Sequence, residues 1–196
     1  MISFIKGPIA TKSPTALEIE AGGIGYDINI SLNTYTQIES LKEVKLHTYL
    51  HVKEDSHTLY GFFEPIERFM FKHLISVSGV GPNTARVVLS SMTAEETRMA
   101  IISNNVAAFK KVKGIGPKSA QRIILDLKDK LIKDAGQNSG SAVHVSNTLQ
   151  DEALSALLAL GFNKAKASKV LQGILSKADT NTPVEQLIKG ALKQLT

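Results

Sequence analysis

Two different spacings of apolar residues divide the chain into a strand-rich first part and a helical remainder. In the first 62 residues apolar and polar positions alternate, as they do around Ile24, Tyr26, Ile28 and Ile30, and this period of two is typical of half-buried strands. About five such strands in roughly 60 residues indicate a small closed barrel, and we expect the oligonucleotide-binding (OB) type.

From about Glu64 the apolar positions recur at helical spacing, which predicts four or five helices ending near Lys133. Residues 135–147 contain no Lys, Arg, Asp or Glu and are rich in small polar side chains, so we expect a flexible linker there. Three further apolar helical faces predict a small three-helix bundle of the UBA-like type. The sequence therefore predicts a multi-domain α+β protein with four parts, 1–63, 64–134, 135–147 and 148–196.

A repeated segment stands out in the predicted helical part. Val77–Ala85 (Val-Ser-Gly-Val-Gly-Pro-Asn-Thr-Ala) and Val112–Ala120 (Val-Lys-Gly-Ile-Gly-Pro-Lys-Ser-Ala) repeat each other at an offset of 35 residues. An apolar helical segment flanks each copy on both sides. Each copy therefore predicts two helices joined by a Gly-apolar-Gly-Pro turn, which is a helix-hairpin-helix motif.

Each residue type in this turn has a physical role. The first glycine can adopt a positive φ and end one helix, while the apolar residue anchors the turn in the core. The second glycine leaves backbone N–H groups uncovered, and proline suits the first turn of the next helix. These N–H groups and the helix dipole form an anion site suited to a DNA phosphate. In the second copy Lys118 and Arg122 share one helix face.

Other interpretations of the glycines are less consistent with the sequence. A dinucleotide-binding fingerprint needs a third glycine and a preceding strand, and a phosphate-binding P-loop needs Lys directly after its last glycine. Neither pattern is present in Gly114–Ser119. An ordinary pair of antiparallel helices with a glycine cap and a proline start remains the structural alternative.

Positive charge is concentrated in the same part of the chain. The formal net charge is +5, and residues 63–137 carry 12 Lys and Arg against 7 Asp and Glu. Such an excess is expected of a module that binds a polyanion, and equally of a solvated basic helix surface.

Composition excludes several other classes of protein. Without cysteine there can be no disulfide framework, thiolate nucleophile or cysteine-ligated metal. No apolar run reaches the roughly 18–20 residues that span a bilayer, and no signal peptide is evident, so we expect a cytoplasmic protein. The histidines do not form a metal-binding pattern and no nucleotide-binding loop is present. We therefore expect no metal or other cofactor, and any use of ATP would belong to a partner.

The order of these features resembles the RuvA family, the Holliday-junction-recognition subunits of bacterial branch-migration complexes. The resemblance covers essentially the whole chain. It is carried by the stretches Gly22–Tyr26, Val52–Asp55, Leu59–Phe62, Gly79–Pro82, Gly114–Lys118 and Leu160–Phe162.

The resemblance implies a non-catalytic protein that forms fourfold homotetramers and holds a four-way DNA junction open in recombination and repair, including the SOS response. One or two tetramers would bind each junction. The implied DNA contacts are Gly79, Gly81, Asn83, Thr84, Gly114, Gly116, Lys118, Ser119 and Arg122. Asn83 stands where a basic residue is common in the family, so we expect a weaker and less salt-dependent grip from the first hairpin.

The resemblance also assigns roles outside the hairpins. Glu54 and Asp55 match an acidic pin whose carboxylates would repel phosphates at the junction centre, although an acidic surface turn is the plain alternative. The last domain would dock on a hexameric ATPase motor (RuvB) through a patch that includes Leu160 and Phe162, unless these residues belong to its core. A junction resolvase (RuvC) is a further implied partner, and no membrane is.

Two other functions are compatible with paired hairpins. One is a DNA glycosylase/lyase with Lys118 as its amine nucleophile, which would need a base-flipping pocket and a catalytic Asp. The candidates Asp126, Asp129 and Asp134 lie on a helix of mixed charge that we expect to face solvent. The other is a scaffold that binds DNA without preferring junctions.

Overall fold

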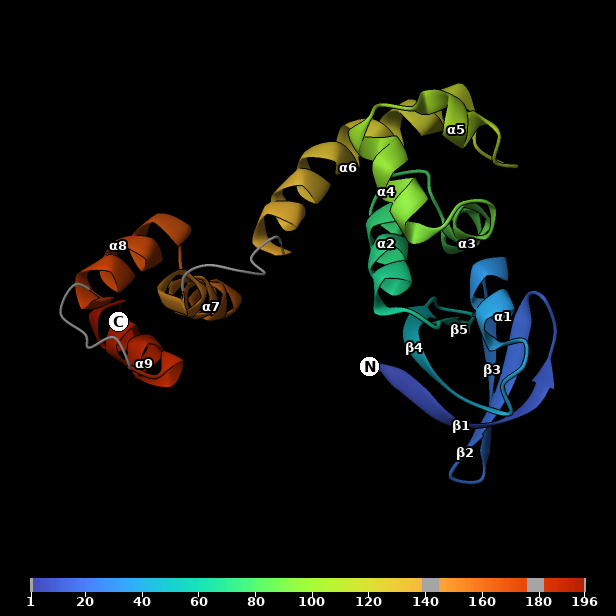
Figure 1. The fold of residues 1–196 in the computed structure, drawn as a ribbon, viewed down its shortest axis with the longest axis horizontal. Coiled ribbons are helices and arrows are strands. Elements are labelled where there is room, and N and C mark those ends of the chain that lie inside the picture. Colours follow the sequence, from blue (N-terminus) through green and yellow to red (C-terminus); the bar gives the residue numbers. More distant parts are fainter. Residues whose placement is uncertain (1, 139–144, 176–181, 196) are drawn as a thin grey trace. The chain divides into compact units, whose positions relative to one another are not determined.

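The computed structural model describes residues 2–138, 145–175 and 182–195. The chain forms two compact units, Met1–Ala135 and Gly136–Thr196, whose elements are labelled in Figure 1. Each unit has its own apolar core and is described separately.

The first unit begins with a closed five-stranded barrel, as predicted. Its strands follow the order β1-β2-β3-β5-β4 around the barrel. They are β1 (Phe4–Lys12), β2 (Ala16–Ala21), β3 (Ile24–Ile30), β4 (Glu43–Val52) and β5 (His57–Phe62). A short helix, α1 (Leu32–Ile38), connects β3 to β4. Most of the alternating apolar residues fill the interior, where Ile19, Ile28 and Leu46 are completely buried, but Ile24 at the start of β3 is exposed.

Five helices follow the barrel within the described part of this unit. They are α2 (Pro65–Ile75), α3 (Pro82–Ser91), α4 (Ala94–Ile102), α5 (Val106–Lys110) and α6 (Pro117–Asn138). Their core includes two residues of β5, Tyr60 and Phe62, whose rings pack against Phe71 of α2 with centroid distances of 5.1 and 4.9 Å. The expected boundary at residue 63 therefore lies inside one compact unit.

The second unit is the predicted three-helix bundle. It consists of α7 (Val145–Ala159), α8 (Lys164–Leu175) and α9 (Val184–Leu195). Each helix contributes residues to the buried core, among them Leu157, Leu171 and Leu187.

Helices extend into both ends of the predicted linker, 135–147. Helix α6 continues to Asn138 and α7 begins at Val145, so helices include both ends of that segment, and 139–144 lies outside the described residues. The physical reason is that each residue added to an existing helix gains a backbone hydrogen bond at little further cost. A lack of charged side chains is therefore not a stop signal by itself.

Candidate nucleic-acid interface

The two predicted hairpins have the same backbone conformation. The first joins α2 to α3 and the second joins α5 to α6. Gly79 has φ +88° and Gly114 has φ +89°, a left-handed conformation that glycine adopts far more readily than other residues. Pro82 and Pro117 are the first residues of the following helices. The predicted roles of the first glycine and of the proline are confirmed in both copies.

The hydrogen bonds within the turns also repeat at the 35-residue offset. Val80 N–H donates to the Val77 carbonyl at 3.0 Å, and Ile115 N–H donates to the Val112 carbonyl at 3.1 Å. The first bond of each following helix runs from Ala85 to Gly81 at 2.9 Å and from Ala120 to Gly116 at 3.0 Å. The two turns are therefore copies of one structure.

Burial divides each turn into an inner and an outer side. Val80 and Ile115 are only 5% and 6% exposed and anchor the turns in the core. All four turn glycines are exposed, and a Cβ added to any of them would meet no atom within 4 Å. The outer side of each turn is therefore open to a ligand backbone.

The open side presents backbone donors. The first N–H groups of a helix have no acceptor within that helix. Within the part of the chain that the structure describes, no acceptor is found for the N–H groups of Asn83 and Thr84 in the first hairpin, or of Lys118 and Ser119 in the second. Such groups at a helix start favour an anion such as phosphate.

Charge distinguishes the two hairpins. The second carries five cations at positions where the first has none. Lys110, Lys111, Lys113, Lys118 and Arg122 correspond by the 35-residue offset to Ile75, Ser76, Ser78, Asn83 and Val87. All five cations are exposed. Of these five cations, the local sequence pattern indicated only Lys118 and Arg122; a comparison of charges across the repeat also indicates the three preceding lysines.

Arg122 has an acidic neighbour one helical turn away. Its Nε lies 3.8 Å from Oδ2 of Asp126, and the two side chains are 56% and 36% exposed. An exposed pair of this kind contributes little to stability, so the guanidinium can exchange its partner for a phosphate at small cost. Lys118 makes no ion pair with any described residue.

Asn83 and the nearby Arg86 face the barrel. Oδ1 of Asn83 accepts a hydrogen bond from the Tyr60 hydroxyl at 3.4 Å. Nη1 of Arg86 donates to the Thr15 carbonyl and to Oδ1 of Asn29, both at 3.0 Å. The only Lys or Arg side chain of α3 is therefore engaged with the barrel.

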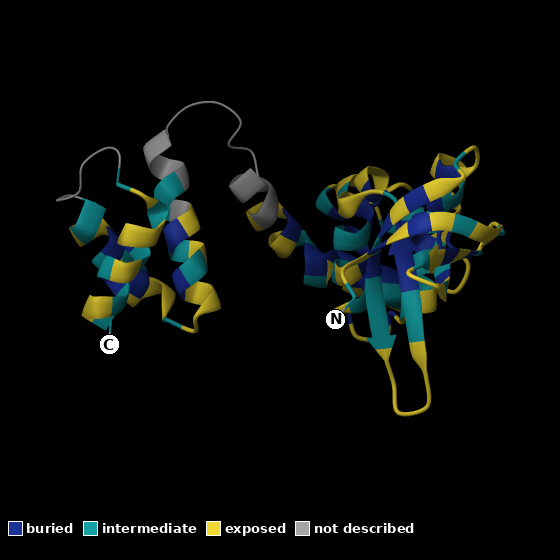
Figure 2. Ribbon diagram, turned by 90° about the horizontal axis from the view of Figure 1, so that it is seen from below, coloured by how far each residue is buried: buried dark blue, intermediate teal, exposed yellow. Residues whose placement is uncertain are grey.

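The acidic pair, Glu54 and Asp55, lies at the tip of a hairpin. Strands β4 and β5 pair up to Val52 and His57, and the Lys53 N–H donates to the Ser56 carbonyl at 2.8 Å to close the turn. Glu54 and Asp55 are exposed between them. Figure 2 shows a two-stranded hairpin whose exposed turn projects from the first unit.

Leu160 and Phe162 have different environments in the turn after α7. Leu160 is 59% exposed, whereas Phe162 is partly buried and packs against the core of the bundle. Gly161 between them has φ +90°. Leu160 is therefore the more open of the two, while Phe162 packs against the bundle's own core and stays partly exposed.

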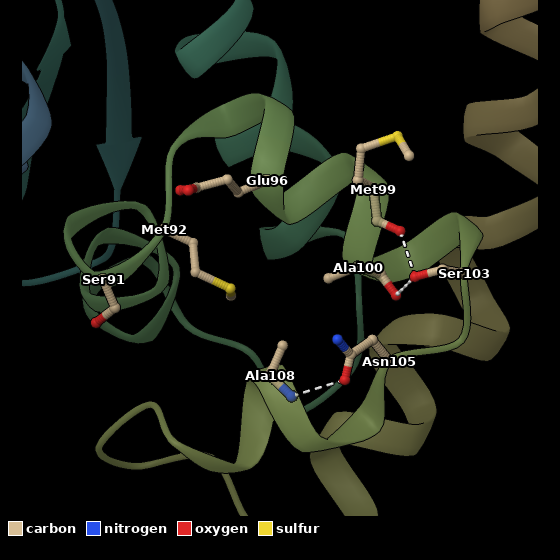
Figure 3. A pocket seen from close by; sticks show the side chains of 8 residues that line it. All are labelled: Ser91, Met92, Glu96, Met99, Ala100, Ser103, Asn105 and Ala108. Carbon is tan, nitrogen blue, oxygen red and sulfur yellow. Dashed lines mark hydrogen bonds between the residues drawn. The ribbon is translucent and has the colours of Figure 1, made fainter.

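A pocket of about 360 Å³ near α4 and α5 bears on the enzyme alternative (Figure 3). Its residues include Met92, Met99 and Ala108, and Lys118 is not among them. Its one carboxylate, Glu96, accepts hydrogen bonds from the N–H and hydroxyl of Thr93, which lower the pKa of Glu96. Among the described residues, this pocket therefore does not bring an acid without a hydrogen-bond partner close to Lys118, the nucleophile that such an enzyme would use. The glycosylase/lyase interpretation gains no support.

The described residues lack the features of a metal site and of a membrane-spanning helix. They contain no group of three or more metal-ligating side chains that could hold an ion. No helix among them has the length and apolar character needed to cross a membrane.

The fold and site define a tandem helix-hairpin-helix protein with an OB-like barrel and a separate helical bundle. Residues 1–61 match the family described as RuvA N terminal domain, residues 71–129 the SAM-like helix-hairpin-helix tandem, and residues 148–196 the RuvA C-terminal domain. The chain belongs to the RuvA family.

Relatives similar over their whole length carry one name, Holliday junction branch migration complex subunit RuvA. The Christiangramia forsetii protein is 53% identical over 100% of both chains. The Cytophaga hutchinsonii protein is 50% identical over 98% of this chain and 99% of its own. The Bacteroides thetaiotaomicron protein is 46% identical over 100% of both chains.

Proposed function

We propose that this protein binds four-way (Holliday) DNA junctions as the non-catalytic DNA-binding subunit of a branch-migration complex. The observation that carries the proposal is the pair of open helix-hairpin-helix turns on the same compact unit as an exposed acidic hairpin. Family membership and the names of the relatives support it.

The hairpins bind the sugar–phosphate backbone. Their N–H groups contact phosphates at Gly79, Gly81, Asn83 and Thr84 in the first hairpin. Gly114, Gly116, Lys118 and Ser119 do so in the second, with Arg122 as a flanking charge. Phosphate contacts fix the position of a protein on DNA and carry no sequence information. Binding therefore depends on the shape of the DNA and on salt, and is independent of sequence.

Lys110, Lys111 and Lys113 extend this interface along the second hairpin. They precede Gly114 and are exposed together with Lys118. Each phosphate neutralised by such a cation releases counterions and makes binding more dependent on salt. The second hairpin therefore supplies most of the electrostatic attraction.

The acidic tip acts by repulsion. Glu54 and Asp55 carry two negative charges at an exposed turn, and a duplex passing this turn brings its phosphates close to them. An open four-way junction leaves space at its centre, where the tips of several subunits can meet. Repulsion against the wrong ligand increases specificity for the right one.

The assembly we propose is a homotetramer on the junction in the cytoplasm, with the three-helix bundle recruiting a hexameric ATPase motor. The exposed Leu160 supports a contact surface on this bundle. The motor supplies ATP hydrolysis, and this chain supplies DNA recognition.

Competition binding tests the function. A labelled four-way junction is titrated with protein at fixed salt, in competition with unlabelled junction or with linear duplex of the same arm sequence. The junction should compete far better, and permuting the arm sequences should change nothing. Equal competition by duplex would instead establish a DNA scaffold without junction preference.

The acidic tip has its own test. Replacing Glu54 by Gln and Asp55 by Asn should raise affinity for linear duplex by about threefold per charge, since a like charge near 7 Å in water costs about 0.6 kcal/mol. Affinity for the junction should change less. The control is Glu18→Gln with Glu20→Gln, which removes the same charge from exposed positions on β2. Equal effects of the two double variants would exclude a specific role for the tip.

A further inference from the structure

We infer that Tyr60 and Arg86 are positioning residues that hold the acidic tip in a fixed place relative to the DNA-binding hairpins and so set the preference for junction over duplex. The inference rests on the proposed function and deepens it. It arises from two links between strand β5, which begins beside the tip, and helix α3, which begins at the first hairpin.

The first link is direct. Tyr60 lies three residues after His57, where β5 begins, so it is about 10 Å along the strand from the base of the turn that carries the tip. Its ring is 5% exposed and packs against Phe71. Its hydroxyl donates to Oδ1 of Asn83 in the first turn of α3. Packing holds the ring, and the hydrogen bond ties the strand to the start of the helix.

The second link runs through Arg86 and Asn29. Arg86 lies three residues after Asn83 on α3 and donates to Oδ1 of Asn29 on β3 at 3.0 Å. Nδ2 of Asn29 donates to the carbonyl of Leu59 on β5 at 3.4 Å. Arg86 also donates to the Thr15 carbonyl between β1 and β2. Both links thus reach β5 at neighbouring residues, and the second also secures the barrel.

Electrostatics couple the two residues. Burial raises the pKa of the Tyr60 phenol, and the charge of Arg86 lowers it in part. The phenol therefore keeps its proton at neutral pH and remains a donor to Asn83.

The second hairpin uses the corresponding positions differently. The 35-residue offset matches Asn83 with Lys118 and Arg86 with Gln121, and both residues of the second hairpin are exposed. Figure 1 shows α3 next to the barrel, while α5 and the start of α6 lie at the far end of the helical part. At these two positions the first hairpin therefore forms hydrogen bonds with barrel residues, although Asn83 itself is exposed like its counterpart Lys118.

The arrangement separates two properties of DNA binding. Backbone N–H groups and lysines determine how strongly any DNA is held. The position of Glu54 and Asp55 determines how strongly duplex is rejected. If the links are broken, the tip can shift and duplex rejection weakens, while the grip is unchanged.

The test compares Tyr60→Phe and Arg86→Gln with matched controls. Tyr60→Phe removes only the hydroxyl, and Arg86→Gln introduces the residue of the second hairpin. The controls are Tyr26→Phe on β3 and Arg98→Gln on α4, whose guanidinium pairs with Glu95. Dissociation constants for junction and duplex are measured at a temperature where circular dichroism shows every variant folded.

Tyr60→Phe should lower the junction-to-duplex affinity ratio, mainly through tighter duplex binding, by a part of the roughly ninefold that removal of both tip charges would give. Arg86→Gln, which loses two hydrogen bonds, should lower the ratio further, and Arg86→Lys should restore part of it. The controls should leave the ratio unchanged. An unchanged ratio in both Tyr60→Phe and Arg86→Gln would overturn the inference.

A double-mutant cycle distinguishes positioning from a general structural effect. In a background with Glu54→Gln and Asp55→Asn, Tyr60→Phe should have no further effect on the ratio, because the repelling charges are gone. An equal effect in both backgrounds would overturn the inference. Failure of the wild-type chain to prefer the junction would instead contradict the proposed function, so the two failures can be told apart.

Discussion

The two helix-hairpin-helix turns have the same backbone conformation but differ at five positions where only the second hairpin carries a cation. Gly79 and Gly114 have φ values within one degree of each other, and the turn hydrogen bonds match to 0.1 Å. Yet the second hairpin has five exposed cations where the first has apolar or neutral residues. Backbone geometry and binding chemistry are thus set by different residues of the same motif.

The neighbours of each hairpin explain the difference. Helix α3 packs beside the barrel, where Asn83 and Arg86 bond to barrel residues. With a lysine at position 83, the Tyr60 hydroxyl would lose the acceptor of its hydrogen bond. Lys118 on α6 has no such partner among the residues that the structure describes, so charge can accumulate there. We interpret the first hairpin as mainly an anchor, which fixes α3 to the barrel and binds DNA only weakly, and the second as mainly a grip, which binds the DNA backbone.

Removal of the lysines that precede Gly114 should have the largest effect. With Lys110, Lys111 and Lys113 changed to Ala, affinity for junction and duplex should fall by roughly two orders of magnitude at 0.1 M salt. The slope of log affinity against log salt should become shallower by about 3, since each lost phosphate contact contributes about 0.9. Fluorescence anisotropy at several salt concentrations measures both quantities.

The control for this variant removes the same charge from the other unit. Lys164, Lys166 and Lys169 on α8 are exposed, and changing them to Ala should leave the slope nearly unchanged. If both triple variants have the same effect, net charge rather than the hairpin governs binding.

Glycine substitutions separate geometry from chemistry. Gly79→Ala and Gly114→Ala should each cost about 1–2 kcal/mol of stability, because alanine is strained at these φ values and no steric contact adds to the cost. Thermal unfolding should show similar losses. DNA affinity should fall more for Gly114→Ala, and a greater loss for Gly79→Ala would reverse our assignment of grip and anchor.

The smallest effect concerns a buried carboxylate that supports the anchored side. Glu67 on α2 accepts hydrogen bonds from Ser31 and, at 2.7 Å, from Thr34. Burial raises its pKa above the usual 4.5, against the effect of these bonds. The folded state therefore favours the protonated form of Glu67. The protonated carboxyl contributes fully to the stability of the protein below pH 4.5, and this contribution is lost as pH rises through the raised pKa.

Glu67→Gln should therefore gain stability relative to wild type as pH rises through that range, by a few degrees of Tm. Thermal unfolding at a series of pH values measures this difference. The exposed Glu18→Gln serves as the control and should show no such trend. A constant difference between Glu67→Gln and wild type at all pH values would contradict the assignment.

Local patterns were sufficient to predict most of the fold. The alternation around Ile24–Ile30 identified a barrel strand, and the repeated Gly-apolar-Gly-Pro identified both turns, including the positive φ of Gly79 and Gly114. These features depend on residues close together in the sequence. The same holds for the acidic tip, which needs only two neighbouring strands.

Contacts between distant residues could not be predicted in this way. Tyr60 and Asn83 are 23 residues apart, and Arg86 lies 57 residues from Asn29, so no local pattern joins them. Their meeting depends on how α3 packs on the barrel. The sequence explains why Asn83 is not basic only after this packing is known.

The salt dependence of junction binding in two matched variants tests the central claim most directly. Lys118→Ala and Asn83→Ala change equivalent positions of the repeat. We predict that Lys118→Ala makes the slope of log affinity against log salt shallower by about 1, while Asn83→Ala leaves the slope unchanged. Equal slopes in wild type and Lys118→Ala, or an equal change in both variants, would contradict a phosphate grip centred on the second hairpin.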